Sequence, residues 1–473
     1  MSAPEPARGP ALEPSPEQPR ERRREALRDA LRPVRMQRIA LTAGLEDLRA
    51  ALIRVGEDGC VQIDAEPTEA SGSAVSAGAG HADGVGGVGG VGGGARDQVD
   101  QYTNAAARHA GAAALTGWCP VDDLPRLTAR LHGIGGAVVA LPAPPGVEPP
   151  TLLRESSATH RSFSVLVRSY GTVPYADCDP TLPVGIVYML MFGVMFGDAG
   201  HGALVVASAL VLRSGRIAAL ARIRHLWRFV AGAGVAATAA GLAYGEFFGP
   251  TTVVPVLWLD PLDQPLRLTG YAIGLGVALL AGAYALGTVN RWREGGPSAA
   301  LYAASGAAGS AVFAGGATVA LGVFTKSQSV SIAGAVCAGL GLVAAGVGLA
   351  AGAPAGVAGG FQVGIGLLDL VTRIGSNVLS FARLAAFGLT HAALGLVVWQ
   401  GVTALARRGP LALAGAVLVF AVGNAAAIAL EGLVVAVQAL RLEYYELFSR
   451  IFAAEGRPFR PFRLSARTPE AVP

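Results

Sequence analysis

Long segments without a charged residue constrain this chain more than any other feature. They cover residues 229–245, 268–290, 295–325, 327–368 and 409–430. An apolar run of about 18 or more residues is long enough to cross the hydrocarbon core of a bilayer as a helix. Because these runs are continuous and do not alternate, they predict membrane-spanning helices and not the strands of a transmembrane barrel.

Composition supports the same class. The 473 residues are 52% hydrophobic and only 15% charged, against roughly 25% charged in an average soluble chain. This balance excludes a soluble enzyme and a disordered protein. The four cysteines form no CxxC pair and no metal-ligand spacing, so we expect neither a metal site nor a disulfide scaffold. Lys326 is the single lysine among 37 basic residues, and this arginine bias gives no indication of a nucleic-acid partner.

Ahead of the apolar region, the sequence predicts a small cytosolic α/β domain over residues 34–180. Residues 1–33 are basic and Pro-rich, which predicts a disordered tail, with a membrane-surface anchor as the alternative. Alternating patterns predict strands at 36–42, 60–63, 114–118 and 136–140, and helices at 45–55 and 124–131. A Gly-rich linker over 66–113 would interrupt this domain.

The apolar region, residues 183–452, predicts about eight spans followed by a cytosolic tail over 453–473. We expect the spans at about 183–197, 200–213, 229–249, 269–290, 299–323, 330–351, 361–405 and 410–450. Five arginines after residue 212 favour a tight pair of helices at 183–213 over one long span, because basic loops stay in the cytosol. Each of the last two helices would exceed roughly 55 Å, so both must tilt strongly or run partly outside the hydrocarbon core.

This arrangement predicts that both termini are cytoplasmic in an integral membrane protein of a prokaryotic cell membrane. Arg407 and Arg408 would then lie outside, against the charge rule.

A polar stripe follows one side of the predicted helix at 361–405. At 100° per residue, the stripe members fall within about 100° of the helix circumference; they are Ser376, Ser380, Arg383, Thr390 and His391. An ionisable side chain at membrane depth is costly and marks a functional site by default. Arg383 therefore is the leading candidate residue, and the alternative is a structural ion pair with a buried carboxylate.

The last predicted helix carries a second stripe. Asn424, Glu431 and Gln438 recur every seven residues, and Arg441 follows. Two facing polar stripes indicate a hydrated ion path, although a single buried Glu431 paired with an arginine is an alternative. Arginine stays protonated and cannot relay protons, so relay would fall to Glu431, His391 and Glu446. Because we expect no carboxylate of this chain opposite Arg383, its partner acid should belong to another subunit.

Four ordered motifs give these residues a family resemblance. The stretch from Ser376 to His391, SNVLSFARLAAFGLTH, resembles the penultimate helix of subunit a, or subunit I, of V-type and V/A-type rotary ATPases. The last helix and its tail are similar through Glu431-Gly, QALRLEYYELFS from Gln438, FAAEG from Phe452 and Pro461-Phe462. Tyr175, Asp179-Pro-Thr181 and FGVMFGDAGHG from Phe192 resemble the start of the membrane domain, and Gly117-Trp-Cys-Pro120 resembles a signature of the soluble domain.

The resemblance implies a membrane stator subunit with two ion half-channels against a ring of proteolipids, each of which carries a membrane carboxylate. Arg383 matches the essential arginine of the family. The other matched ion-path positions are Arg441, Gln438, Glu431, His391, Ser380 and Ser376. The resemblance also implies contacts with a central-stalk collar and peripheral stalks. No phosphate-binding GxxxxGK[ST] loop is present, so nucleotide hydrolysis would take place in other subunits, and no cofactor is expected.

Two alternatives remain: a stand-alone secondary transporter and a membrane scaffold that no longer conducts. A transporter should show internal repeats, and the sequence has no clear repeat. The part before residue 183 is shorter than the arm of typical family members, which puts the stalk contacts in question. The sequence does not distinguish H⁺ from Na⁺ as the ion, nor ATP synthesis from hydrolysis.

Overall fold

The computed structural model describes residues 32–64, 95–144, 146–154, 157–452 and 455–464. Within them the chain forms two compact units. The α/β unit holds residues 33–154 and 456–464, and the helical unit holds residues 157–455. All but the last residues of the predicted N-terminal tail lie outside the described part of the chain.

The α/β unit is built on an antiparallel sheet of order β2-β4-β1-β5, with β3 paired to β4. Alternating buried and half-exposed residues form the central strand β1, as expected for a sheet with one face on the core. The strands are β1 (Met36–Gly44), β2 (Gln62–Ile63), β3 (Ala107–His109), β4 (Ala112–Pro120) and β5 (Gly136–Leu141). All four predicted strand positions therefore carry strands, with shifted ends.

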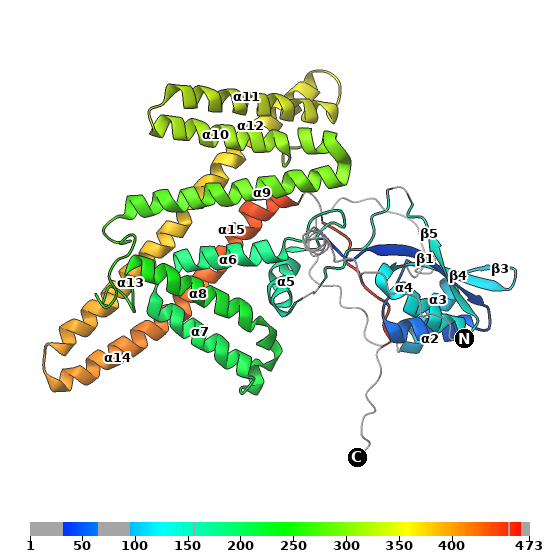
Figure 1. Ribbon diagram of the computed structural model, residues 1–473, viewed down its shortest axis with the longest axis horizontal. Helices are drawn as coiled ribbons and strands as arrows, with labels where there is room; N and C mark the ends of the chain where they lie inside the picture. Colours follow the sequence, from blue (N-terminus) through cyan, green and yellow to red (C-terminus); the bar gives the residue numbers. More distant parts are fainter. Residues whose placement is uncertain (1–31, 65–94, 145, 155–156, 453–454, 465–473) are drawn as a thin grey trace, which may run out of the picture. The chain divides into compact units, whose positions relative to one another are not determined.

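Three helices pack together on this sheet (Figure 1): α2 (Leu48–Asp58), α3 (Ala95–Ala105) and α4 (Leu124–His132). Their apolar sides supply Leu52, Val55 and Leu127, each 1% exposed, to a core shared with Ile39 of β1. Helix α2 ends at Gly59, which adopts the left-handed conformation at φ 58° that a side chain disfavours.

The predicted Gly-rich linker is wrong over its second half. Residues 95–113 form α3, β3 and the start of β4, whereas residues 66–94 lie outside the described chain. Helix α3 is polar over most of its surface, but Val99 is only 2% exposed and Tyr102 packs edge-on against Phe462, with ring centroids 5.0 Å apart. Two well-placed apolar side chains are thus enough to anchor a helix that composition assigns to a linker.

The C-terminal segment 456–464 is part of the α/β unit. Thr151 N–H donates to Arg457 O at 2.7 Å, and Phe462 N–H donates to Val61 O at 2.8 Å. Gln62 Oε1 accepts from the backbone N–H of Arg460 at 2.7 Å. The Phe462 ring, 7% exposed, completes the core over α3.

Replacing Phe462 with Ala should loosen the α/β unit, because deletion of a buried aromatic ring costs about 3 kcal/mol. We expect amide hydrogen exchange in α2 and β2 of the full chain to accelerate by about 100-fold. Arg460→Ala is the matched control, since Arg460 is exposed and its bond to Gln62 uses the backbone. Equal exchange in the two variants would contradict this role for the tail.

Among its described residues, the helical unit has six helices long and apolar enough to cross a membrane and two shorter apolar helices. The shorter pair is α6 (Thr181–Met195) and α7 (Ala199–Ser214). The longer elements include α8 (Trp227–Tyr244), α9 (Pro265–Tyr302), α10 (Ala307–Phe324) and α11 (Gln328–Ala351). Helix α9 turns at Gly296, where φ is 72° and Pro297 follows. The count of eight spans remains a prediction.

Helices α6 and α7 are separate, as the five arginines after residue 212 predict. Asp198 caps α7 by accepting a bond from His201 N–H at 2.8 Å. Behind the break, α7 and α8 pack closely because small residues line their interface (Figure 1). A Cβ on Gly234 would lie 2.8 Å from Val206 N, so this contact requires glycine.

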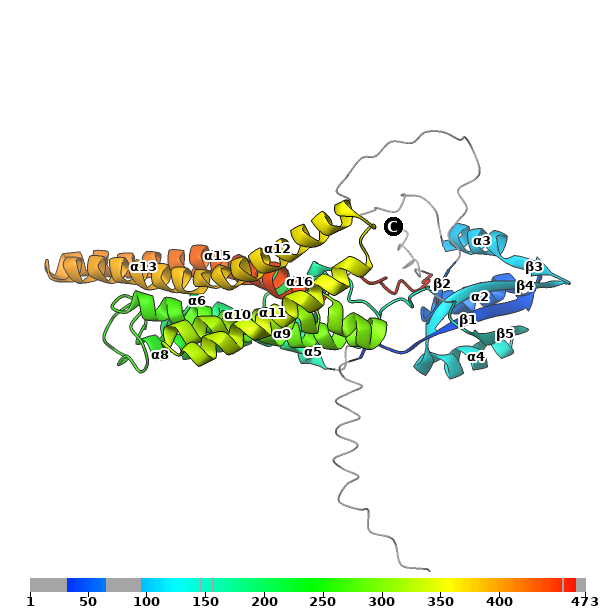
Figure 2. The same cartoon turned by 90° about the horizontal axis from the view of Figure 1, so that it is seen from above.

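The two longest helical stretches run side by side at one end of the unit (Figures 1 and 2). The first joins α12 (Val357–Ser380) to α13 (Ala382–Ala406), 50 residues in all. The second, Ala412–Ile451 by its apolar length, joins α14 (Pro410–Ala426), α15 (Gly432–Leu442) and α16 (Ser449–Ile451). At about 1.5 Å per residue, both are longer than a bilayer core of about 30 Å.

The segment before α6 forms hydrogen bonds with several helices. Asp179 accepts bonds from Thr181 N–H at 3.0 Å, from the Thr181 hydroxyl at 2.6 Å and from His160 Nε2 at 2.9 Å; His160 lies on α5 (Ala158–Tyr170). Burial alone would raise the pKa of Asp179, but these hydrogen bonds outweigh it and lower that pKa. Asn290 of α9 bonds Cys178 N–H at 3.1 Å and Ile451 O at 3.2 Å.

Asp179→Asn should destabilise the helical unit at neutral pH by about 1–3 kcal/mol, because the ionised carboxylate is the stabilised form. A lowered folded-state pKa means that this stability is present above the unfolded value and lost as pH falls through the folded pKa. The difference in Tm between wild type and variant, measured in detergent, should therefore be large at pH 7 and shrink in acid. Asp263→Asn, at an exposed position, is the control; a difference independent of pH would contradict the assignment.

Candidate functional site

The pairing of α13 with the last long stretch sets the geometry of the candidate site. Two glycines of α14 lie against α13: a Cβ on Gly415 would be 3.0 Å from Leu405, and a Cβ on Gly423 would be 2.8 Å from Val398. Residue numbers therefore decrease along α13 as they increase along the last long stretch, so the two helices are antiparallel. The same register brings His391 to Glu431 and, farther along, Arg383 to Glu446.

A chain of buried hydrogen bonds begins at Glu431. His391 Nδ1 lies 2.6 Å from Glu431 Oε2, and His391 Nε2 lies 3.2 Å from His201 Nδ1. His201 Nε2 in turn lies 2.8 Å from Asn424 Oδ1. His201 is 1% exposed, His391 4% and Asn424 6%. Four side chains from α7, α13 and the last long stretch thus form one connected polar network.

The hydrogen bonds restrict where protons can sit in this network. Asn424 Nδ2 donates to Phe420 O at 2.8 Å, which leaves Oδ1 to accept from His201 Nε2–H. A neutral His201 then accepts at Nδ1 from His391 Nε2–H. The remaining proton lies between His391 Nδ1 and Glu431, either on the imidazole with an ionised carboxylate or on the carboxyl with a neutral imidazole. This bond is where the network can exchange a proton.

Asp198 supports the network from the break between α6 and α7. Its carboxylate accepts bonds from His201 N–H at 2.8 Å, Phe248 N–H at 3.0 Å and Gly249 N–H at 2.8 Å. It also lies 3.7 Å from His201 Nδ1. Ligand atoms of Asp198, His201 and His391 lie within 4.8 Å of one another, close enough for a metal ion. Because these atoms already have hydrogen-bond partners, the arrangement fits a polar network better than a metal site.

Arg383 occupies a second polar cluster. Its side chain is 22% exposed, and its Nη2 lies 3.8 Å from Glu446 Oε1. The other terminal nitrogen, Nη1, is buried without a hydrogen-bond partner. Ser380 and Arg441 are further polar neighbours of the Glu446 carboxyl. The prediction that no carboxylate of this chain faces Arg383 is therefore wrong, although 3.8 Å is too long for a hydrogen bond.

The remaining predicted positions lie along the same helices. Arg441 and Ser376 are exposed, and Ser380 is half-buried. Gln438 is half-buried, and its Oε1 has no hydrogen-bond partner. The two stripes therefore meet at two places: His391 with Glu431, and Ser380 and Arg383 with Glu446 and Arg441. Gln438 lies between these two meeting places in the sequence of the last long stretch, and its Oε1 is free to accept a hydrogen bond.

Both glutamates of the site lie on π-helical segments. Residues Ala427–Glu431 and Glu443–Phe448 interrupt the last long stretch as η3 and η4. A π-turn widens a helix locally and is often found at functional sites. Glu431 is the last residue of the first π-helical segment, and Glu446 lies within the second. The two wide turns thus place Glu431 and Glu446 against α13 at two different positions along its length.

Asp198 and His201 are site residues that the periodicity of the long helices does not reveal. Both residues lie on a different, Gly-rich part of the chain, at the break between α6 and α7. His201 nevertheless contacts His391, 190 positions away. The available signal was the pair of ionisable residues inside the otherwise apolar stretch 183–212. The sequence does identify Asn424, as a member of the second polar stripe.

Comparison with known proteins supports the resemblance found in the motifs. Residues 103–249 match the profile of the V-type ATPase 116kDa subunit family. The chain is 26% identical to the A-type ATP synthase subunit I of Pyrococcus horikoshii over 74% of its own length and 53% of the relative. It is 29% identical to the subunit I of Aeropyrum pernix over 68% of its length and 52% of the relative.

A shorter match, 35% identical, joins 30% of the chain to 19% of the human V-type proton ATPase 116 kDa subunit a 3. The chain is thus similar over most of its length to subunit I of A-type ATP synthases, and over shorter segments to subunits I and a of V-type ATPases. Its long apolar helices are those of a helical membrane protein. The chain spans about half the length of the curated subunit I relatives from Pyrococcus and Aeropyrum that it matches.

Proposed function

We propose that the chain is the ion-conducting stator subunit of a V/A-type rotary ATPase. In this role, α12–α13 and α14–α16 form two half-channels against a ring of proteolipids, each with a membrane carboxylate. The observation that carries the proposal is Arg383, a partly exposed guanidinium on an apolar helix with a buried Nη1 that has no hydrogen-bond partner. An unsatisfied charge at this depth is costly, and an arriving carboxylate would satisfy it.

The surroundings of Arg383 favour contact with another membrane protein. Large apolar side chains on the same long helices are exposed, among them Leu379 at 68%, Leu433 at 66% and Val437 at 53%. Lipid would cover such a surface, and so would a ring of apolar helices. Exposed Arg441 lies on this stretch as well. A surface that combines apolar side chains with two arginines suits a ring whose carboxylates pass by in turn.

Arg383 would act through its fixed positive charge. Arginine holds its proton at physiological pH, so Arg383 would favour the ionised form of a nearby ring carboxylate and promote proton release. Glu446, at 3.8 Å, would pair with Arg383 between visits of ring carboxylates. The same charge would repel a passing cation and keep the two half-channels apart.

The Glu431–His391–His201 network would move protons along one half-channel. Its shared proton between His391 Nδ1 and Glu431 can pass without rearrangement of heavy atoms, since the two atoms already lie 2.6 Å apart. Gln438 and Ser380 would line the path between this network and Arg383. Transport of H⁺ fits this network directly, because histidine and carboxylate relay protons, whereas the choice between H⁺ and Na⁺ also depends on the ring.

The proposal places the chain in a prokaryotic cell membrane, with both termini in the cytoplasm. Its partners would be the proteolipid ring, a central-stalk collar and peripheral stalks. A stand-alone transporter and a non-conducting scaffold are the competing functions. Copurification with a proteolipid ring would exclude the transporter, and ion flux in the assembled complex would exclude the scaffold.

Arg383→Ala should abolish ATP-driven ion pumping in membrane vesicles while the complex still assembles, because it removes the fixed charge that would promote proton release from the ring carboxylate. Arg383→Lys should also fail substantially, since an ammonium lacks the planar fork and can lose its proton. Gln438→Ala should reduce pumping without abolishing it. Arg373→Ala is the matched control on α12, where the arginine is exposed and pairs with Asp369 at 2.6 Å. Normal pumping by Arg383→Ala would refute the proposal.

His201→Ala should lower pumping by about 100-fold, the usual effect of losing a positioned proton-transfer group. The reason is that His201 orients His391 Nε2 and so directs Nδ1 toward Glu431. His225→Ala, at an exposed histidine outside the network, is the control. Unchanged flux with His201→Ala would remove this network from the ion path while leaving the role of Arg383 untouched.

A further inference from the structure

Two cysteines of the α/β unit lie in contact. Cys60 stands between Gly59, the C-cap of α2, and strand β2, whereas Cys119 is the second-last residue of β4. The pairing of Gln62 with Trp118 places both at the same end of adjacent strands. The two thiols are close enough that each shifts the pKa of the other, and Cys119 Sγ also lies 3.4 Å from Pro120 O. Positions far apart in the sequence thus bring two sulfur atoms together.

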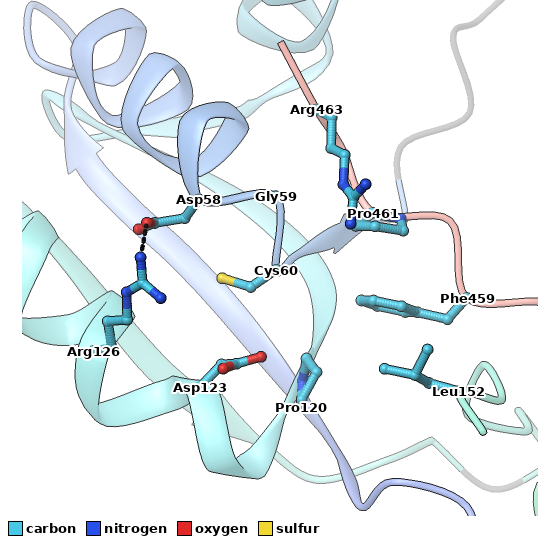
Figure 3. Close-up of a pocket in the computed structure, with 10 residues that line it drawn as sticks. All are labelled: Asp58, Gly59, Cys60, Pro120, Asp123, Arg126, Leu152, Phe459, Pro461 and Arg463. Carbon is cyan, nitrogen blue, oxygen red and sulfur yellow. Dashed lines mark hydrogen bonds and ion pairs between the residues drawn. The ribbon is translucent and has the colours of Figure 1, made fainter. Parts of the chain in front are cut away.

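The two thiols differ in access. Cys119 is fully buried in the core, whereas Cys60 is half-exposed and lines a cavity of about 440 Å³. Figure 3 shows the Cys60 sulfur directed into this cavity, between Asp58 and Asp123. Tail residues Phe459, Pro461 and Arg463 close another side. A small solute can therefore reach Cys60. The buried Cys119 thiol reacts only after Cys60 has been modified.

The surroundings make Cys60 the more reactive thiol. The contact with Cys119 lowers the pKa of Cys60, and this effect outweighs burial and the nearby negative charges of Asp123 and Asp58. The same contact raises the pKa of Cys119. Asp58 is itself neutralised by Arg126 at 3.4 Å and Arg130 at 2.5 Å. Cys60 is then the nucleophile, and Cys119 is placed to react second.

We infer that Cys60 and Cys119 form an oxidation site at which a small hydroperoxide converts the two thiols into a disulfide. The Cys60 sulfur attacks one peroxide oxygen, the O–O bond breaks, and the other oxygen leaves after protonation, as an alcohol or, from hydrogen peroxide, as water. The Cys119 sulfur then attacks the sulfenic sulfur, the S–O bond breaks, and water leaves. With hydrogen peroxide, two thiols and one peroxide give one disulfide and two waters.

A bound metal explains the pair less well. Within the described ranges, the cluster of metal-ligating groups that meets the spacing of a metal ion is the one at Asp198, and it does not include these cysteines. The nearby carboxylate of Asp58 is already paired with Arg126 and Arg130. Two thiols in contact beside a paired carboxylate suit a disulfide better than tetrahedral zinc.

The disulfide would act on the segment that holds the C-terminal tail. Phe462 N–H bonds Val61 O at 2.8 Å and Leu464 N–H bonds Gly56 O at 3.1 Å, on either side of Cys60. A Cβ on Gly59 would lie 2.9 Å from the Arg463 side chain, so the tail lies directly on this turn. Cross-linking Cys60 to β4 would fix the surface against which the tail packs.

The test uses the purified full chain in detergent, treated with hydrogen peroxide at a few molar equivalents. Peptide mass mapping should show a Cys60–Cys119 disulfide that a phosphine reductant reverses, and the Cys337→Ser control should behave as wild type. Cys119→Ser should trap sulfenic acid on Cys60, captured by dimedone at least tenfold faster than on Cys337. Exchange rates of the amides of Phe462 and Leu464 should fall in the oxidised protein.

Absence of the internal disulfide, or its replacement by links between chains, would overturn the inference. So would dimedone labelling of Cys60 no faster than that of Cys337 in Cys119→Ser, with Cys119→Ala as a second variant if the first misfolds. Protection of both thiols by added zinc, with no oxidation, would assign the pair to metal binding instead. None of these outcomes depends on ion transport, so the proposed function stands or falls separately.

Discussion

The structure depends on an incomplete ion pair inside an apolar helix bundle. Arg383 and Glu446 lie 3.8 Å apart, close enough to attract and too far to hydrogen-bond, and one guanidinium nitrogen is buried without a partner. A fully formed internal pair would be a structural element. In an incomplete pair, the Nη1 of Arg383 stays free to bind a carboxylate from another chain. The proposed transport depends on this property of the fold.

The helices supply the geometry that holds this pair open. Small residues let α13 and the last long stretch approach closely beyond His391, where Gly423 and Gly415 contact the opposite helix. Toward Arg383 the partners change register, and the π-helical segments at 427–431 and 443–448 absorb the change. The two glutamates thus face α13 at different levels, one in a buried network with His391 and one beside an exposed arginine surface.

The sequence predicts much of this and fails for local physical reasons. Periodicity identifies both polar stripes, because side chains repeat every 3.6 residues in a regular helix. It misplaces Glu446 because a π-turn rotates the residues beyond it, and it misses the contact of His201 with His391 because that contact joins distant segments. Helix α3 escapes detection because its polar surface outweighs Val99 and Tyr102. The long apolar runs, in contrast, predict the helical class of the fold directly.

The most direct measurement is the environment of Arg383 in the assembled complex, determined by electron cryomicroscopy of the chain with its ring. We expect the guanidinium to face a ring carboxylate within about 4–6 Å, a range at which opposite charges shift each other's ionisation, with Glu446 beside the pair. A guanidinium bound through both terminal nitrogens to Glu446, with lipid on its exposed side and no ring helix nearby, would contradict this expectation.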